Sequence, residues 1–138
     1  MIIDATDLIA GRIATVAAKR ALMGEKVDIV NAEKAIISGS RDDVFAKFKR
    51  RRAFGAPLTG PYNPRMPDRL MRRIARGMLR HRVGRGREAY ARIMCYIGVP
   101  LQFKDQKIET IEKAHKSSLP NTKYVTLKEI CRFLGATL

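Results

Sequence analysis

Positive charge is concentrated in the middle third of this 138-residue chain. Residues 47–92, here called the basic segment, hold 15 basic and two acidic residues, a net charge of +13, whereas the remainder holds 13 basic and 11 acidic residues. Because so charged a segment cannot be buried as a core, the flanking residues must supply most of the folded frame. Thirteen of its 15 basic residues are arginine, whose planar guanidinium binds phosphate and stacks on bases. The sequence therefore predicts a nearly neutral frame that presents a basic region to a polyanion, most commonly nucleic acid.

The first 39 residues have the alternation of a strand, a helix and a strand. An apolar helix from Gly11 to Met23, stopped by Gly24, separates short apolar runs. This order predicts a parallel α/β sheet. A length of 138 residues with 46% hydrophobic residues suits one domain with one core, spanning residues 1–138. The expected strands are 1–5, 27–32, 35–38 and 91–100.

Two helices are predicted from their start signals. Ser40 with Asp43, and Thr126 with Glu129, have the spacing of a capping box, so a helix is expected after each pair. A weaker helical pattern lies at residues 107–116. The expected inner faces are Val44, Phe45 and Phe48 in the first helix, and Leu127, Ile130, Cys131 and Leu134 in the last.

A further helix is expected from Pro67-Asp68 to about Arg80, with Asp68 as its N-cap. At about 100° per residue, five arginines fall within one arc of roughly 100°, and apolar residues occupy the other side. This helix is therefore predicted to pack one side on the core and to present an outward arginine stripe that serves binding and not folding. The stripe consists of Arg69, Arg72, Arg73, Arg76 and Arg80, and the apolar side of Leu70, Met71, Ile74 and Met78.

Residues 55–67, here called the arm, are rich in glycine and proline, which predicts an ordered loop or extended arm rather than a helix or strand. The arm has Tyr62 and Arg65 but no acidic residue, so it suits contact with RNA. Residues 49–67, which add the mutually repelling basic residues 49–52 to the arm, have few apolar anchors and are predicted to become ordered on RNA. Further along, Gly84 and Gly86 alternate with arginines, which is expected to let backbone and side chains approach phosphates. The prolines that limit the entropy lost by the arm are Pro57, Pro61, Pro64 and Pro67.

Signals for catalysis or metal binding are weak. Cys95 and Cys131 form no CxxC pair, and His81 and His115 stand 34 positions apart. The turn before Gly11 is neither a GxGxxG nor a Walker loop. We therefore expect no enzyme, no catalytic or metal-binding residue, no cofactor and no small-molecule substrate. No apolar run approaches the ~18 residues of a membrane span, and no secretion signal is evident, so we expect a cytoplasmic protein with no membrane partner.

Short motifs along residues 2–100 resemble, as an ordered set, a universal family of large-ribosomal-subunit proteins, the one numbered thirteen. The tail, in Lys123–Leu127 and Leu134–Ala136, resembles the archaeal branch. One departure is Arg80-His81, where family members commonly have proline after Met-Leu. The motifs are Ile3–Ala5, Gly11–Ala14, Val30–Lys34, Ser38-Gly39, Gly60-Pro61, Arg65–Pro67, Arg76–Leu79, Arg85-Gly86 and Tyr96–Pro100.

The resemblance implies a compact three-layer α/β/α fold around a four-stranded, mostly parallel sheet, to which the basic arm and the arginine-rich helix are added. It also implies that the chain binds large-subunit (23S-type) ribosomal RNA early in subunit assembly, beside neighbouring large-subunit proteins in the cytoplasmic ribosome. The alternatives are an extraribosomal RNA-binding regulator of translation and a phosphate-handling enzyme with a nucleotide at the Gly11 turn. The residues expected to contact RNA are Lys47, Lys49, Arg50, Arg51, Arg52, Tyr62, Arg65, Arg69, Arg72, Arg73, Arg76, Arg80, Arg82, Arg85 and Arg87.

Overall fold

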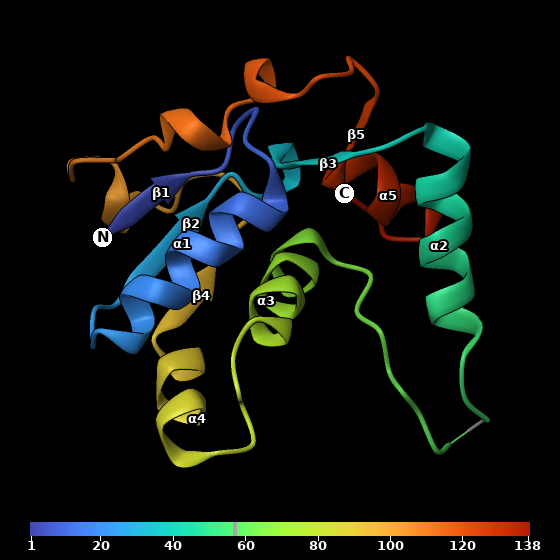
Figure 1. Ribbon diagram of the computed structural model, residues 1–138, viewed down its shortest axis with the longest axis horizontal. Helices are drawn as coiled ribbons and strands as arrows, with labels where there is room; N and C mark the ends of the chain where they lie inside the picture. Colours follow the sequence, from blue (N-terminus) through green and yellow to red (C-terminus); the bar gives the residue numbers. More distant parts are fainter. Residues whose placement is uncertain (57) are drawn as a thin grey trace.

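The computed structural model describes every residue of the chain except residue 57, and it has a mixed α/β architecture (Figure 1). Three short strands form a parallel sheet in the order β1-β2-β4, in which Ile3 is paired with Ile29. The predicted parallel sheet is therefore confirmed, with three strands. These strands are β1 (Ile2–Asp4), β2 (Val27–Val30) and β4 (Ile93–Cys95).

Helices cover one face of this sheet. α1 (Ala10–Leu22) packs against the strands, and α3 (Pro67–Gly77) and α4 (Gly84–Ala91) pack beside it. Five alanines of α1 are buried, and such small side chains let a helix lie close to its neighbours. Ile3 and Ile29 meet these helices in the main core. The core therefore lies between the sheet and the predicted apolar helix.

The opposite face of the sheet is covered differently. Ile2 and Val30 pack against Phe103, which belongs to the short 3-10 helix η2 (Leu101–Phe103). The ring of Tyr96 stands edge-on to Phe103, with 5.3 Å between the ring centroids. The side chains that cover Ile2 and Val30 thus come from residues 96–108 and not from an α-helix, so the second helical layer implied by the resemblance is not found among the described elements.

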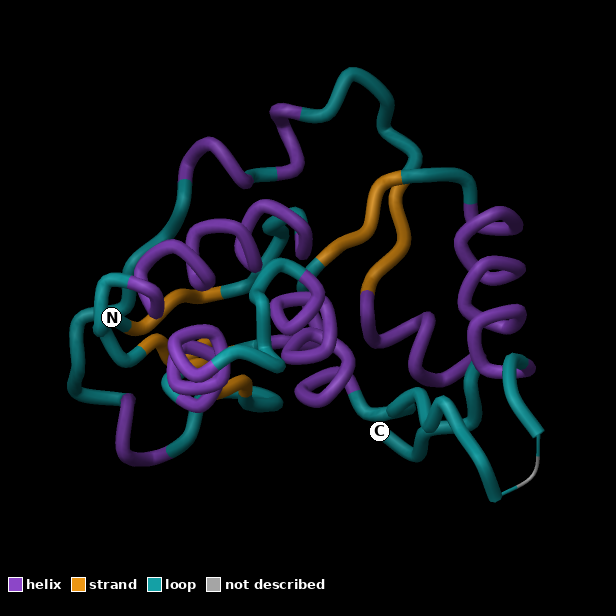
Figure 2. The backbone as a smooth tube through the Cα atoms, turned by 60° about the horizontal axis from the view of Figure 1, so that its bottom comes forward, coloured by secondary structure: helices purple, strands orange, loops and turns teal. Residues whose placement is uncertain are grey.

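The strand expected as the fourth of the first sheet belongs instead to a second, two-stranded sheet. β3 (Ile36–Ser38) pairs antiparallel with β5 (Tyr124–Thr126), and Ile37 is paired with Val125. Asn31, which follows β2, has a left-handed backbone with φ of 54° and leads into a 3-10 turn. This turn redirects the chain, so the expectation of a four-stranded sheet is not met. Figure 2 shows the two sheets side by side.

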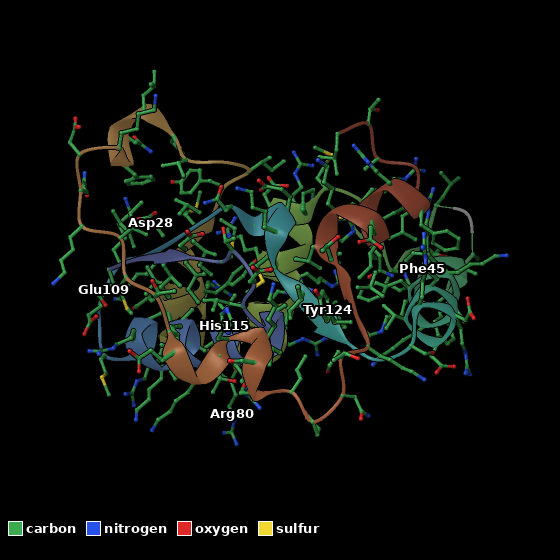
Figure 3. All side chains as sticks on the ribbon, turned by 90° about the horizontal axis from the view of Figure 1, so that it is seen from above. Asp28, Phe45, Arg80, Glu109, His115 and Tyr124 are labelled. Atoms are coloured by element: carbon green, nitrogen blue, oxygen red, sulfur yellow. The ribbon has the colours of Figure 1, made fainter. Side chains whose placement is uncertain are left out.

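Both capping boxes begin helices as predicted. Ser40 accepts a hydrogen bond from the amide of Asp43 at the start of α2 (Arg41–Ala53). Thr126 likewise caps α5 (Leu127–Phe133) by accepting from the Glu129 amide at 3.3 Å. The rings of Phe45 and Phe133 then stack with centroids 4.5 Å apart, which joins α2 to α5. Figure 3 shows Phe45 on the side of α2 that faces α5. None of the described helices has the length and apolar character needed to cross a membrane.

The arginine-rich helix α3 is shorter than predicted at its C-terminal end. Its N-cap is Met66 rather than Asp68, because Pro67 takes the first helical position, where its missing N–H costs nothing. It ends at Gly77, three residues before Arg80. The amide of Met78 bonds to a carbonyl only three residues back, as is usual in a closing turn. The departure from family pattern at Arg80-His81 therefore lies beyond the helix and does not extend it.

Two further expectations on element boundaries are wrong. β4 stops at Cys95, so the expected strand over 91–100 is cut short, and Gly98 adopts a left-handed φ of 65° that extended residues avoid. Residues 107–116 form no α-helix but contain the 3-10 turn η3 (Glu112–Ala114). In this segment the carbonyl of Lys113 accepts a side-chain hydrogen bond from Arg12 of α1 at 2.5 Å. The two residues are 101 positions apart, so the local sequence pattern could not predict this contact.

Helix α4 was not predicted, because its first residues are glycine and arginine. Gly86 is buried in this helix against the backbone of Arg80, and a Cβ placed on it would lie 2.2 Å from the Arg80 carbonyl oxygen. Gly86 thus permits contact between two parts of the chain, not the approach to phosphate expected for it. Gly84, by contrast, has open space where its Cβ would be.

We expect Gly86→Ala to lower the free energy of unfolding by about 1–3 kcal/mol, because the backbone at Arg80 has no room to move aside cheaply. Gly84→Ala is the matched control and should be neutral or stabilising by up to ~1 kcal/mol. Urea denaturation of both variants measures the difference. Equal stability of the two variants would contradict the contact between Gly86 and Arg80.

Candidate nucleic-acid interface

The basic segment lies mainly along one side of the molecule, which is the lower side in Figure 1. It comprises the C-terminal half of α2, the arm, α3, the turn after α3, and α4. The arm and α4 are its lowest parts in that view. The described part of the chain has ion pairs at Asp7, Glu25, Asp28 and Glu88, and only the Glu88 pair, with Arg92, involves the basic segment. The arginines predicted to bind RNA therefore have no carboxylate among the described residues within 4.0 Å.

The five predicted contact residues of α2 are exposed, and two of them lie over aromatic rings. The guanidinium of Arg51 is 5.7 Å from the centroid of the Phe48 ring, and that of Arg50 is 5.7 Å from the Phe54 ring. Arg52 instead donates a hydrogen bond to the carbonyl of Leu134. These five residues are spread around the helix rather than gathered on one face: Lys47, Lys49, Arg50, Arg51 and Arg52.

The arm is joined to α2 by one side-chain contact. The Asn63 amide donates to the carbonyl of Arg51 at 2.6 Å. Tyr62 is 73% exposed, and its hydroxyl donates to the carbonyl of Leu58, so the ring is held while its face stays open to solvent. Arg65 is exposed and lies near the backbone of Gly135. Pro57, expected to stiffen the arm, lies outside the described residues.

Helix α3 divides its arginines between two roles. Arg69 is exposed, and Arg73 and Arg76 are half-buried. Arg72 does not face freely outward as predicted, because its Nε donates to the carbonyl of Ile93 at 3.0 Å and its guanidinium covers the Tyr90 ring at 4.6 Å. Arg72 therefore joins α3 to β4 and α4, which corrects the prediction that the whole stripe serves binding alone.

The apolar side of α3 is also turned slightly from its predicted position. Leu70 and Met71 are buried as expected, and Ala75 is buried with them. Ile74 is only half-buried, and Met78 is exposed because it lies beyond the last residue of the helix. The buried face is thus centred near Met71 and Ala75, which brings Arg73 and Arg76 partly into the protein.

Positive charges approach one another where α2 and α3 meet. Burial lowers the pKa of Arg73, and the charges of Arg76 and Arg51 lower it further. An arginine remains protonated even so, and its charge is therefore held in a place that disfavours it. A bound anion would relieve this repulsion, as expected of a phosphate site.

The remaining predicted contacts follow α3. Arg80 is exposed and points away from the body of the molecule in Figure 3. Arg82 lies in the turn, and Arg85 and Arg87 lie on the first turns of α4, all exposed. The N-terminal end of a helix attracts anions through its free amides, so these arginines and the backbone favour the same charge.

A cavity of about 550 Å³ opens between α2, the arm and α3. Its apolar lining includes Phe48, Phe54 and Ile74, and its charged lining includes Arg51 and Arg73. Neither phenylalanine is among the residues predicted to contact RNA. Their position within a run of lysine and arginine was the available signal, since aromatic rings interleaved with basic residues are typical of RNA-binding surfaces.

The cysteines and histidines show the environments of structural residues. Burial raises the pKa of Cys95 and of Cys131 to about 12, so both thiols are protonated at neutral pH. The Nδ1 atom of His115 accepts from the Ser117 amide at 3.2 Å. The described residues contain no group of three or more histidine, cysteine, aspartate or glutamate side chains that could hold a metal ion.

Comparison with known proteins places the chain in a family. Residues 1–102 match the family model described as Ribosomal protein L13. A "Large ribosomal subunit protein uL13" of Methanococcoides burtonii is 43% identical over 135 residues, which are 98% of this chain and 97% of the relative. The protein of the same description in Archaeoglobus fulgidus is 44% identical, over 97% of this chain and 86% of its own length. The chain, with its basic side built on a parallel α/β frame, therefore belongs to the ribosomal protein L13 family.

Proposed function

We propose that this chain is a non-enzymatic structural constituent of the large subunit of the cytoplasmic ribosome and that it works as one RNA-binding domain. Its relatives bear the name of a large-ribosomal-subunit protein. The observation that carries the proposal is the basic side, where exposed arginines of α2, α3 and α4 have no carboxylate partners among the described residues. Such a surface needs a polyanion, and ribosomal RNA is the polyanion of that particle.

Binding is proposed to proceed through contacts between arginine and phosphate. Exposed guanidinium groups provide most of the charge, and Tyr62 adds a ring face on which an exposed base can stack. The apolar frame, whose buried side chains face the interior, positions these groups and supplies no chemistry of its own. Neighbouring large-subunit proteins are proposed as further partners, and support of subunit assembly as the result of RNA binding.

Sedimentation distinguishes this proposal from an extraribosomal regulator. We expect a tagged full-length chain to co-sediment with large subunits in a sucrose gradient and to stay with them at physiological salt. A messenger-binding regulator would instead remain near the top of the gradient or follow messenger RNA. The purified protein should also bind a large-subunit ribosomal RNA transcript more tightly than a messenger transcript of equal length.

We predict that the arm becomes ordered when RNA binds. Leu58 is 92% exposed, so the described residues of the arm bury little apolar surface that could offset the entropy cost of ordering. Amide hydrogen exchange should be rapid across residues 55–66 in the free protein and strongly slowed in the subunit. The expectation that residues 49–53 also become ordered only on RNA is wrong, because α2 continues to Ala53, so these residues should be protected in both states. Strong protection of the arm in the free protein would contradict this prediction.

A further inference from the structure

The cavity between α2, the arm and α3 combines an apolar interior with positive charge at its edge. Phe54 lines it and is 56% exposed, although Arg50 already lies over the ring. Phe48 and Ile74 form the deeper apolar wall. A volume of about 550 Å³ is within the range of small-molecule sites, and it exceeds what a single water-filled surface dimple provides.

The arginines at the edge of the cavity have hydrogen-bond donors available for an anion. Arg51 and Arg73 both line the cavity, and neither guanidinium donates a hydrogen bond within the described part of the chain. None of the described lining residues is acidic. Arg52, which also lines it, is already bonded to the Leu134 carbonyl. The cavity thus offers two guanidinium groups, one of them over the Phe48 ring, whose hydrogen-bond donors no described residue uses.

We propose that this cavity receives one unstacked nucleotide of the bound RNA, with its base against Phe54 and its phosphate between Arg51 and Arg73. The inference rests on the proposed function and adds to it a specific subsite. A nucleotide is the RNA component that joins a flat, largely apolar ring to an anion, which matches the two parts of the lining. An apolar side chain of a neighbouring protein would fill the interior but leave both charges without an anion.

Two substitutions test the base contact without removing charge. Phe54→Leu keeps an apolar side chain at an exposed position but removes the ring face, so affinity for a full-length large-subunit ribosomal RNA transcript should fall about tenfold, as one stacked base implies. Phe54→Tyr keeps the ring and should bind like the parent protein. Thermal midpoints should stay close to the parent value for both, which separates binding from folding.

A second pair of variants tests the space itself. Gly77 lines the cavity and has open space where its Cβ would be, so Gly77→Leu should narrow the cavity and weaken RNA binding severalfold. Gly11→Leu is the matched control, because Gly11 also lies in a helix and has open space where its Cβ would be, but it belongs to α1, outside the basic segment and the cavity lining. All four variants keep every arginine, so the slope of the salt dependence should become shallower by no more than about one, which corresponds to the single phosphate proposed for this subsite.

Ultraviolet crosslinking of the RNA complex provides an independent measurement. We expect a nucleotide adduct on the peptide that carries Phe54, and its loss in Gly77→Leu but not in Gly11→Leu. Parental affinity in both Phe54→Leu and Gly77→Leu would overturn the subsite while leaving the proposed function intact. A crosslink from this peptide to another protein in assembled subunits would also overturn it. Failure of the parent protein to bind the transcript would instead refute the proposed function.

Discussion

Reversing the charges of Arg69, Arg73 and Arg76 to glutamate is expected to weaken binding to large-subunit ribosomal RNA by at least about 100-fold, since each charged hydrogen bond to phosphate contributes on the order of 1.5–3 kcal/mol. The thermal midpoint should change little, because these side chains make no described hydrogen bond or ion pair to the frame. Filter binding and thermal denaturation of the same preparations measure the two effects.

The position of the reversed charges, and not the net charge of the protein, should determine how much RNA affinity is lost. The control variant reverses Lys19, Lys104 and Lys128, which are exposed and lie outside the basic segment, so it has the same net charge as the test variant. We expect it to retain most of the affinity. An equal loss in both variants would show that binding depends on overall charge and would contradict a localised interface.

Arg72 should behave unlike the rest of the stripe. Its hydrogen bond to Ile93 and its contact with the Tyr90 ring are both lost in Arg72→Glu, and the new carboxylate would face a carbonyl oxygen. We therefore expect a lower thermal midpoint in that variant, with a loss of about 1–3 kcal/mol of stability for the unpaired buried acceptor. A thermal midpoint equal to that of the parent protein would contradict a structural role for Arg72 and would place it with the arginines that serve binding alone.

The affinity for ribosomal RNA is expected to fall steeply with salt. If about eight phosphates are neutralised, the logarithm of the binding constant should fall against the logarithm of salt concentration with a slope of about −6 to −7. Between 50 and 200 mM salt this corresponds to a loss of roughly three to five orders of magnitude. The basic segment, with 15 basic and two acidic residues, supplies enough cations for that number of contacts.

Binding isotherms at four or more salt concentrations give the slope directly. The triple variant of α3 should show a slope shallower by about 2–3, because each lost phosphate contact releases one counterion fewer. A slope of the parent protein shallower than about −2 would mean that few phosphates are neutralised and would contradict an electrostatic interface.

Features that depend only on neighbouring residues are predicted well from the sequence. The capping boxes at Ser40 and Thr126 begin α2 and α5, because the side chain that caps a helix and the amide that it caps are three residues apart. The apolar helix after the first strand is likewise found as α1, one residue earlier at each end than expected. Such local rules hold because no distant contact is needed to satisfy them.

The missed features depend on distant contacts. β3 leaves the first sheet because β5, more than 80 residues later, offers it a partner, and no pattern near Ile36 shows this. α4 forms although glycine disfavours helices, since Gly86 lets it approach the backbone of Arg80. For the interface, helical periodicity placed Arg72 on the outer face, but Arg72 turns inward to the Ile93 carbonyl and to the ring of Tyr90, which is 18 positions away, so its structural contact could not be predicted from the local pattern.

The stacking of Phe45 on Phe133, together with the hydrogen bond from Arg52 to Leu134, makes the orientation of α2 depend on the C-terminal residues. Phe133 and Leu134 lie beyond residue 102, where the family match ends, and they hold α2, the most basic helix, against the rest of the protein. Substitutions at these C-terminal positions would therefore tilt α2 and change the direction in which its basic side chains point, without changing any charge.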